Sequence, residues 1–310
     1  MPELPEAETI VRGLRGPLEG ALVGTVRVIH ADVLDGEPAE LARGLEGTRI
    51  TRVGRRGKNV VIGLDSGLRL VVNLGMSGRL LWRRRDDPSP PPSHPAVSFG
   101  LLRGTGGDAS SETFAPGGDV VYHDPRRFGR IRLLGPGAWR TWSRGMGPEP
   151  LAPGFTAGVL AEALAGSKSP IRSWLLDQRK VAGVGNIYAS EACHLARIHP
   201  QTPAGRIDAD GTRRLHRAVR KVLAGAVAAG GTTLRDYRTA EGWEGAYQYA
   251  LRAYGREGLP CPRCGEAIVR VVFSNRSAFY CPRCQPEPAP APGTPVSGSR
   301  PGPPPPRGAS

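Results

Sequence analysis

Four cysteines near the end of the chain have the spacing of metal ligands. They form two CxxC pairs, Cys261-Pro-Arg-Cys264 and Cys281-Pro-Arg-Cys284, with 16 residues between the pairs. This spacing is typical of a four-cysteine zinc ribbon, in which two turns close a tetrahedral site. The same thiolates would accept iron of the rubredoxin type, but no redox motif accompanies them, which favours zinc. We therefore expect one structural Zn²⁺, and the catalytic group must lie elsewhere because all four ligands come from the protein.

The first residues offer a different chemistry. If Met1 is removed, Pro2 presents a secondary amine, and the pKa of an α-amino group, about 8, leaves part of it unprotonated at neutral pH. Such an amine can attack the C1′ atom of a sugar and form an iminium. Glu3 can transfer protons beside it. An ordinary chain start explains both residues as well, so Pro2 and Glu3 alone do not decide between the two interpretations.

The first part of the chain is predicted to be rich in strands. Residues 5–18 have apolar side chains at helical spacing, with proline and glutamate suited to a first helical turn. From residue 23 to about 134 the pattern changes to short β-branched runs broken by glycine, which predicts a sheet-rich domain over residues 1–138. The segments 88–95 and 104–118 are rich in proline, glycine and serine, and are expected to be mobile loops on that domain.

Helical spacing returns after a turn signal at residues 147–150. The segments that show it are 159–164, 171–176, 187–196 and 215–228. They predict a helical domain over residues 147–235, followed by a unit with the cysteine pairs and two strand-like runs over residues 236–285. Residues 286–310 are mostly Pro, Gly, Ala and Ser and are expected to be disordered, because they cannot bury enough apolar surface to fold. The expected fold class is α+β, in several domains.

The chain is strongly basic. It has 42 Lys and Arg against 28 Asp and Glu, a formal charge of +14, and a pI near 10.3. This charge predicts a polyanionic partner, with nucleic acid ahead of an anionic membrane. No stretch approaches the roughly 18 apolar residues of a spanning helix, and no apolar signal-peptide core follows the acidic start. We therefore expect a soluble, cytoplasmic protein.

Five segments match the motifs of one family in the same order. They are Met1-Pro-Glu-Leu-Pro-Glu-Ala-Glu-Thr9, Asn73-Leu-Gly-Met-Ser-Gly78, Asp124-Pro-Arg-Arg-Phe-Gly129, residues 175–191, and Tyr254-Gly-Arg-Glu-Gly258. Together they resemble formamidopyrimidine-DNA glycosylase, also called Fpg or MutM, over residues 1 to about 285. The resemblance implies an N-terminal β-sandwich with flanking helices, a helix-two-turns-helix domain and the zinc ribbon, with damaged double-stranded DNA between the halves. It also implies a monomeric base-excision-repair enzyme that removes oxidised purines and then cleaves the abasic strand by β- and δ-elimination.

The resemblance further implies roles for residues near the chain start. Pro2 matches the nucleophile and Glu3 the general acid and base. Glu6 matches another acidic residue of the same pocket, although a favourable position in a first helical turn explains it too. Lys58 matches the active-site lysine that holds the phosphate beside the lesion, and a merely basic surface is the alternative for the run that contains it.

Five other residues match contacts with DNA. Met76, Arg126 and Phe128 match the residues that fill the gap when a nucleotide is extruded, and core packing is the alternative for Met76 and Phe128. Arg126 would face the orphaned base and favour cytosine. Asn186 matches a phosphate-binding residue of the helix-two-turns-helix motif, and Arg276 the ribbon arginine that grips a second phosphate.

The chain also departs from the family pattern. Asn73 stands where the family usually has histidine, and the loop around His94 lacks a second histidine. Residues 104–118 look like an insertion. The remaining cysteine, Cys193, lies in a helical segment and is expected to be a small core residue.

Two other functions compete with the one that the resemblance favours. A non-catalytic zinc protein that binds DNA would explain the charge and the ribbon, but it needs neither Pro2 nor Glu3. An enzyme of the endonuclease VIII type would act on oxidised pyrimidines. Its start typically differs from that of this chain, and residues 231–245 resemble the lesion-capping loop of Fpg more closely.

Overall fold

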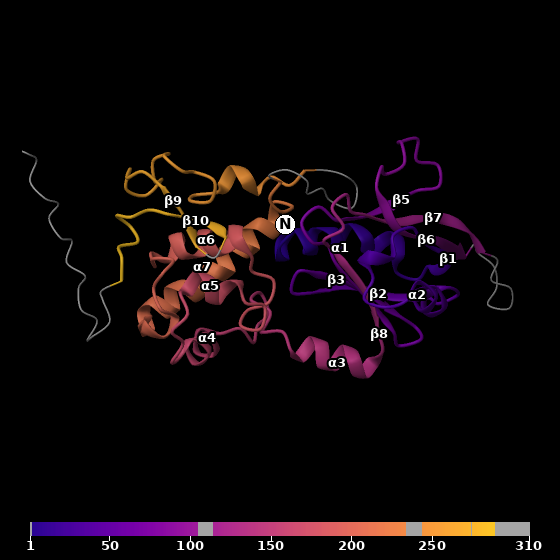
Figure 1. The fold of residues 1–310 in the computed structure, drawn as a ribbon, viewed down its shortest axis with the longest axis horizontal. Coiled ribbons are helices and arrows are strands. Elements are labelled where there is room, and N and C mark those ends of the chain that lie inside the picture. The colour runs from indigo at the N-terminus through magenta and orange to yellow at the C-terminus, as the bar shows by residue number, and fades with distance from the viewer. Residues whose placement is uncertain (1, 105–113, 234–243, 274, 289–310) are drawn as a thin grey trace, which may run out of the picture.

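The first half of the molecule is a sandwich of two antiparallel four-stranded sheets (Figure 1). The computed structural model describes residues 2–104, 114–233, 244–273 and 275–288. One sheet has the order β1-β6-β7-β5, and its strands are β1 (Leu22–Val28), β6 (Pro95–Gly104), β7 (Phe114–His123) and β5 (Arg79–Arg83). The other has the order β2-β3-β4-β8, and its strands are β2 (Ile50–Arg56), β3 (Asn59–Leu64), β4 (Arg69–Asn73) and β8 (Arg130–Leu134).

Two helices flank the sandwich, and one of them reaches the other half of the molecule. Helix α2 (Pro38–Leu45) buries Leu41 and Leu45. Helix α1 (Leu4–Leu18) contributes Ile10 and Leu14 to the core of the sandwich, whereas Leu4 packs in the core of the helical half. The start of α1 therefore lies where the two halves meet.

The second half is helical. It contains α4 (Ala157–Leu164), α5 (Ile171–Leu176), α6 (Asn186–Ala196) and α7 (Ala209–Ala228), and α3 (Pro136–Arg144) connects it to the sandwich. Short 3-10 helices of this half are Ala204–Arg206 and Tyr247–Ala250, and another, Ala31–Val33, lies in the first half between β1 and α2. Trp174 and Tyr188 are among the largest buried side chains of the helical half. Within the described ranges, no helix is both long and apolar enough to cross a membrane.

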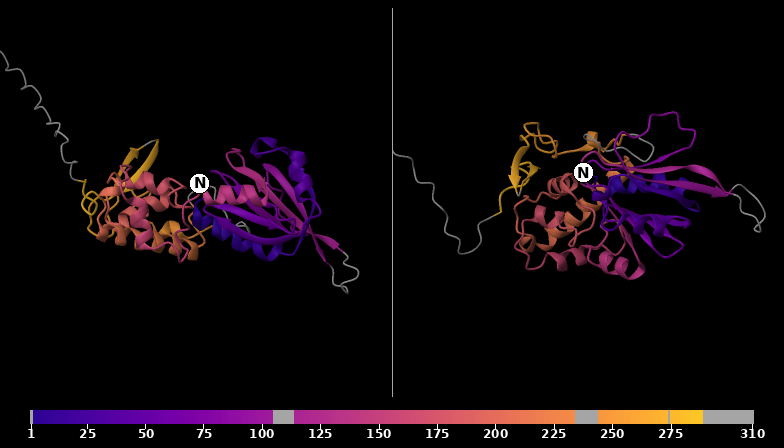
Figure 2. Two further views of the ribbon diagram at one scale, coloured as in Figure 1. Left: turned by 90° about the horizontal axis from the view of Figure 1, so that it is seen from below. Right: turned by 45° about the vertical axis from the view of Figure 1, so that its right-hand side comes forward.

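The last unit is a small β-hairpin that stands on the helical half. Its strands are β9 (Val269–Phe273) and β10 (Arg276–Tyr280), paired in antiparallel register. In both views of Figure 2 this hairpin lies on the helices, away from the sandwich. Its own core is small and includes Ile268 and Phe279 beside the cysteines.

The expected fold class is confirmed, and so are the predicted helices. The helix predicted over 5–18 is α1, and the four later periodic segments are α4 to α7. The loop predicted over 104–118 is wrong in part, because residues 114–118 pair with β6 as the start of β7. Residues 105–113, 234–243 and 289–310 are outside the described ranges, and with them most of the capping loop and of the tail.

Candidate active site and zinc ribbon

Glu3 is held at the N-terminus of α6. Its carboxylate accepts hydrogen bonds from the backbone N–H groups of Gly185 (2.8 Å), Ile187 (2.8 Å) and Tyr188 (3.3 Å). The side chain is 2% exposed. Free N–H groups at the start of a helix, and the positive end of its dipole, attract an anion. Two segments 182 residues apart thus form one carboxylate site.

The environment of Glu3 brings its carboxyl group into the range of proton transfer at neutral pH. Burial and the neighbouring charge of Glu6 raise its pKa from 4.5 to about 7, against the opposing effects of the α6 N–H groups and of Lys58. A group with such a pKa can both donate and accept a proton near neutrality. Pro2, directly before it, is buried as well.

Glu6 joins three segments of the chain. Its carboxylate accepts hydrogen bonds from the backbone N–H groups of Glu3 (2.7 Å) and Thr232 (2.8 Å), and from the hydroxyl of Tyr188. Tyr188 also contacts the hydroxyl of Thr232 at 2.8 Å. Burial raises the pKa of Glu6. Glu6 is therefore not simply an exposed acid of a first helical turn but a buried support for the site.

Lys58 lies in the turn between β2 and β3 and is half-buried. Burial lowers its pKa, the charge of Glu3 opposes that effect, and the charge of Arg276 adds to it. Glu3, Lys58 and Arg276 are thus close enough for their charges to interact, although they come from the chain start, the sandwich and the ribbon. The turn is anchored to the second half because the N–H group of Gly57 donates to Glu149 at 2.6 Å.

Two neighbouring loops present large apolar side chains to solvent. Met76 is 44% exposed and Phe128 is 59% exposed, so neither packs in the core. The guanidinium carbon of Arg126 lies 5.7 Å from the centre of the Phe128 ring, which is a cation–π contact. A Cβ on Gly75 would lie 2.6 Å from the carbonyl carbon of Phe128, so these loops require glycine to pack so closely.

A buried aspartate holds these two loops together. Asp124, 1% exposed, accepts hydrogen bonds from the Ser77 hydroxyl (2.6 Å), the Tyr122 hydroxyl (2.9 Å) and the Gly129 N–H group (2.9 Å). Asn73, at the base of the first loop, accepts a hydrogen bond from Gly75 N–H at 3.0 Å. The asparagine in the usual histidine position thus fixes the backbone beside Met76.

Asn186 contacts the ribbon. Its amide donates to the backbone oxygen of Ser277 at 3.1 Å, and Arg172 donates to the same oxygen at 2.9 Å and to the side-chain oxygen of Asn186. Arg276, next to Ser277, is exposed. The start of α6 therefore positions the hairpin that presents Arg276, and the predicted phosphate contact of Asn186 stays a prediction.

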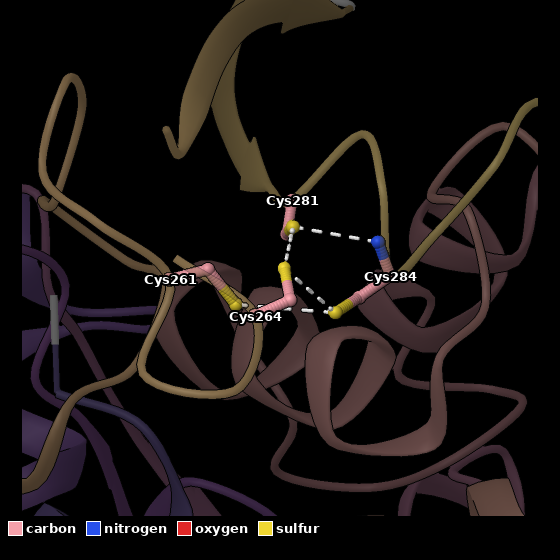
Figure 3. Close-up of side chains that lie close together, drawn as sticks. All are labelled: Cys261, Cys264, Cys281 and Cys284. Carbon is pink, nitrogen blue, oxygen red and sulfur yellow. Dashed lines mark hydrogen bonds between the residues drawn. The ribbon is translucent and has the colours of Figure 1, made fainter. Parts of the chain in front are cut away.

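The four ribbon cysteines come together as expected (Figure 3). Their sulfur atoms all lie within 4.8 Å of one another, with Cys261–Cys284 at 4.0 Å and Cys264–Cys281 at 3.5 Å. Zn–S bonds of about 2.3 Å in a tetrahedron place sulfurs about 3.8 Å apart, so the set fits a zinc ion. Cys193 is separate, buried in the helical core, and burial raises its pKa to about 12.

Comparisons with known proteins agree over most of the chain. Residues 1–131 match the formamidopyrimidine-DNA glycosylase N-terminal domain, residues 146–238 its H2TH domain, and residues 258–286 the zinc finger found in FPG and IleRS. The formamidopyrimidine-DNA glycosylase of Chloroflexus aggregans is 42% identical over 286 residues, which are 92% of this chain and 98% of that protein. The chain belongs to the formamidopyrimidine-DNA glycosylase family. The family and the cysteine geometry together make the ribbon a structural zinc site.

Solved structures of the family have the same fold. The MutM (Fpg) protein of Thermus thermophilus superposes with a TM-score of 0.78 at 38% identity, covering 93% of this chain and all of that one. A Lactococcus lactis FPG mutant in complex with Fapy-dG containing DNA gives a TM-score of 0.81 at 29% identity, covering 92% of this chain and all of that one.

Several residues that build the site were not predicted from the sequence. Gly185 and Tyr188 lie within a motif that was noticed for its resemblance alone, although a glycine directly before a helix is a signal for an anion site. Asp124 begins another such motif. Thr232 lies in the segment that resembles the lesion-capping loop, but nothing there pointed to its contact with Glu6. Arg172 carried no signal, because its contact with Ser277 joins residues far apart in sequence.

Proposed function

We propose that the chain is a bifunctional DNA glycosylase and lyase that excises oxidised purines, including 8-oxoguanine and formamidopyrimidines, with the amine of Pro2 as nucleophile. The observation that carries this proposal is the position of Glu3. Its buried carboxyl group, directly after Pro2, has a pKa of about 7 and accepts hydrogen bonds from backbone N–H groups at the start of α6. A protein that only binds DNA gains nothing from burying a carboxylate beside its N-terminus, since such burial costs stability.

The proposed chemistry assigns a proton to each step. The unprotonated amine of Pro2 bonds to C1′ as the bond from C1′ to the damaged base breaks; the base leaves with the bonding electrons and takes up the proton that the Pro2 nitrogen loses. The C1′–O4′ bond then opens, O4′ takes a proton, and an iminium remains between Pro2 and C1′. Loss of a proton from C2′ expels the 3′ phosphate, and loss of a proton from C4′ then expels the 5′ phosphate. Glu3, with its pKa near 7, is suited to give the proton at O4′ and to assist the transfer at C2′.

Charges around the site support a role in holding the DNA backbone. Burial is the main cause of the lowered pKa of Lys58, and the positive charge of Arg276 adds to it, so the two cations repel each other across the site. A phosphate group between or beside them would relieve this repulsion. We propose that Lys58 and Arg276 hold the phosphates that flank the extruded nucleotide.

Met76, Arg126 and Phe128 are suited to replace that nucleotide in the stack. Met76 and Phe128 are exposed apolar side chains on loops that Asp124 fixes, which is what a wedge between base pairs requires. We propose that they fill the gap while Arg126 contacts the orphaned base. We further propose that the protein acts as a monomer in the cytoplasm, at the nucleoid, in keeping with its charge of +14.

Borohydride trapping tests the proposed nucleophile. Duplexes with 8-oxoguanine or thymine glycol are incubated with the full chain and borohydride, which reduces the iminium to a stable adduct. We expect an adduct at Pro2 with 8-oxoguanine, and none when an N-terminal extension blocks the amine while binding persists. Trapping by the blocked protein would exclude Pro2. Preferential trapping with thymine glycol would instead indicate the endonuclease VIII type of activity.

A further inference from the structure

A buried histidine lies against one of the zinc ligands. His194 belongs to the last turn of α6 and is 1% exposed. Its Nε2 atom is 3.4 Å from the sulfur of Cys261. The other ring nitrogen, Nδ1, is buried and has no hydrogen-bond partner among the described residues. The sulfur of Cys261 is therefore the polar group toward which this imidazole is directed.

The end of α6 is also joined to the ribbon by other contacts. Arg263, between the first two cysteines, donates to the backbone oxygen of Leu195 at 3.4 Å. The fully buried Gln285 accepts from the N–H group of Cys281 at 3.0 Å and donates to the oxygen of Ile198 at 2.8 Å. The contacts of Arg263 and Gln285 thus hold the end of α6 against the ribbon and keep His194 close to Cys261.

The chemistry of the ligand set determines the direction of this hydrogen bond. A cysteine that binds zinc is a thiolate, which accepts hydrogen bonds and donates none. The proton of neutral His194 must then be on Nε2, where it faces the sulfur. Four thiolates around one Zn²⁺ leave a net charge of about −2 in a small volume. An N–H group that points at one sulfur disperses part of that charge and fixes the orientation of the ligand.

We propose that His194 is a positioning residue of the zinc centre, whose Nε2–H group donates a hydrogen bond to the zinc-bound thiolate of Cys261. The bond connects the metal to one end of α6, while the other end of the same helix seats Glu3 and contacts the ribbon at Ser277. This inference concerns the metal and does not depend on the proposed nucleophile.

Three variants of the full chain separate the hydrogen bond from packing. His194→Phe keeps a ring of similar size and removes the donor. His194→Gln keeps an N–H donor at a similar reach. The control is His199→Phe. His199 is another buried histidine that packs against the ribbon, with its ring centre 4.6 Å from that of Tyr280. Among the described residues, its ring nitrogens form no hydrogen bond with a cysteine.

Two measurements on these proteins address the sulfur directly. The first is the rate of zinc release to a competing chelator, and the second is the sulfur-to-metal charge-transfer absorption after replacement of zinc by Co²⁺. In His194→Phe we expect the affinity for zinc to fall on the order of 10-fold, so that zinc passes to the chelator faster. We also expect the absorption to move to longer wavelength, because a thiolate without its donor gives up an electron more readily. His194→Gln and His199→Phe should retain the wild-type band.

The proposal fails if His194→Phe retains the wild-type band and release rate, or if His199→Phe changes both to the same extent. If His194→Phe does not fold, His194→Leu, which also lacks a donor, takes its place. A folded Leu variant with a shifted band and faster zinc release supports the proposal, and one with the wild-type band and release rate refutes it.

Discussion

Replacing Gly185 by alanine should displace the carboxyl group of Glu3 from the start of α6 without straining the local backbone. Gly185 has φ −128° and ψ −159°, an extended conformation that alanine also adopts. A Cβ at this position would lie 2.4 Å from Cδ of Glu3 and 2.6 Å from its Oε1. Because non-bonded carbon atoms normally stay about 3.5 to 4 Å apart, the carboxyl group must move by about 1 Å.

The size of the effect follows from what that movement breaks. Forcing an extra methyl group into a packed interior costs about 1 to 3 kcal/mol of unfolding free energy. Moving a reacting group by about 1 Å lowers a rate by about 100-fold. The displaced carboxyl group also leaves the N–H groups of Gly185 and Ile187 without their acceptor. We therefore expect Gly185→Ala to be less stable by about 1 to 3 kcal/mol and to excise 8-oxoguanine about 100-fold more slowly.

Single-turnover excision and chemical denaturation measure the two quantities on the same protein. The matched control is Gly137→Ala in α3, where an added Cβ meets no atom within 4 Å and should leave both quantities near wild type. Binding to undamaged duplex should be unchanged in both variants, because it depends on surface charge. A Gly185→Ala protein with wild-type excision would show that the position of Glu3 on α6 does not matter for the chemistry.

Four further outcomes are expected. The unfolding free energy of wild type relative to Glu3→Gln should fall by about 3 kcal/mol as pH rises from 4.5 to 7, because the folded protein favours the protonated carboxyl of Glu3. If the unfolding free energies of the two proteins change with pH in parallel, the raised pKa is contradicted. Met76→Ala should slow excision without weakening binding to undamaged DNA. Arg126→Ala should reduce the preference for cytosine over adenine opposite the lesion by about 1 to 3 kcal/mol. Equal preferences in wild type and Arg126→Ala would count against the proposed role of Arg126. Cys261→Ser should lose zinc and lesion binding together, measured by metal analysis and titration, and tight binding by the metal-free protein would refute this.

Local chemistry in the sequence determined a large part of this protein. The spacing of the cysteine pairs predicted the zinc site, because two short turns suffice to bring four thiolates together. The helices α1 and α4 to α7 followed from apolar spacing, which reflects contacts between residues three or four apart. Helix α2 escaped notice because it is short and buries only Leu41 and Leu45.

Only the tertiary structure decided the properties on which the proposed chemistry depends. The pKa of Glu3 is set by burial, by Glu6, and by N–H groups of a helix that begins at residue 186. The exposure of Met76 and Phe128 depends on Asp124, which holds two loops from different parts of the sandwich. Burial and the approach of charges are sums over residues that are distant along the chain, so no window of the sequence contains them.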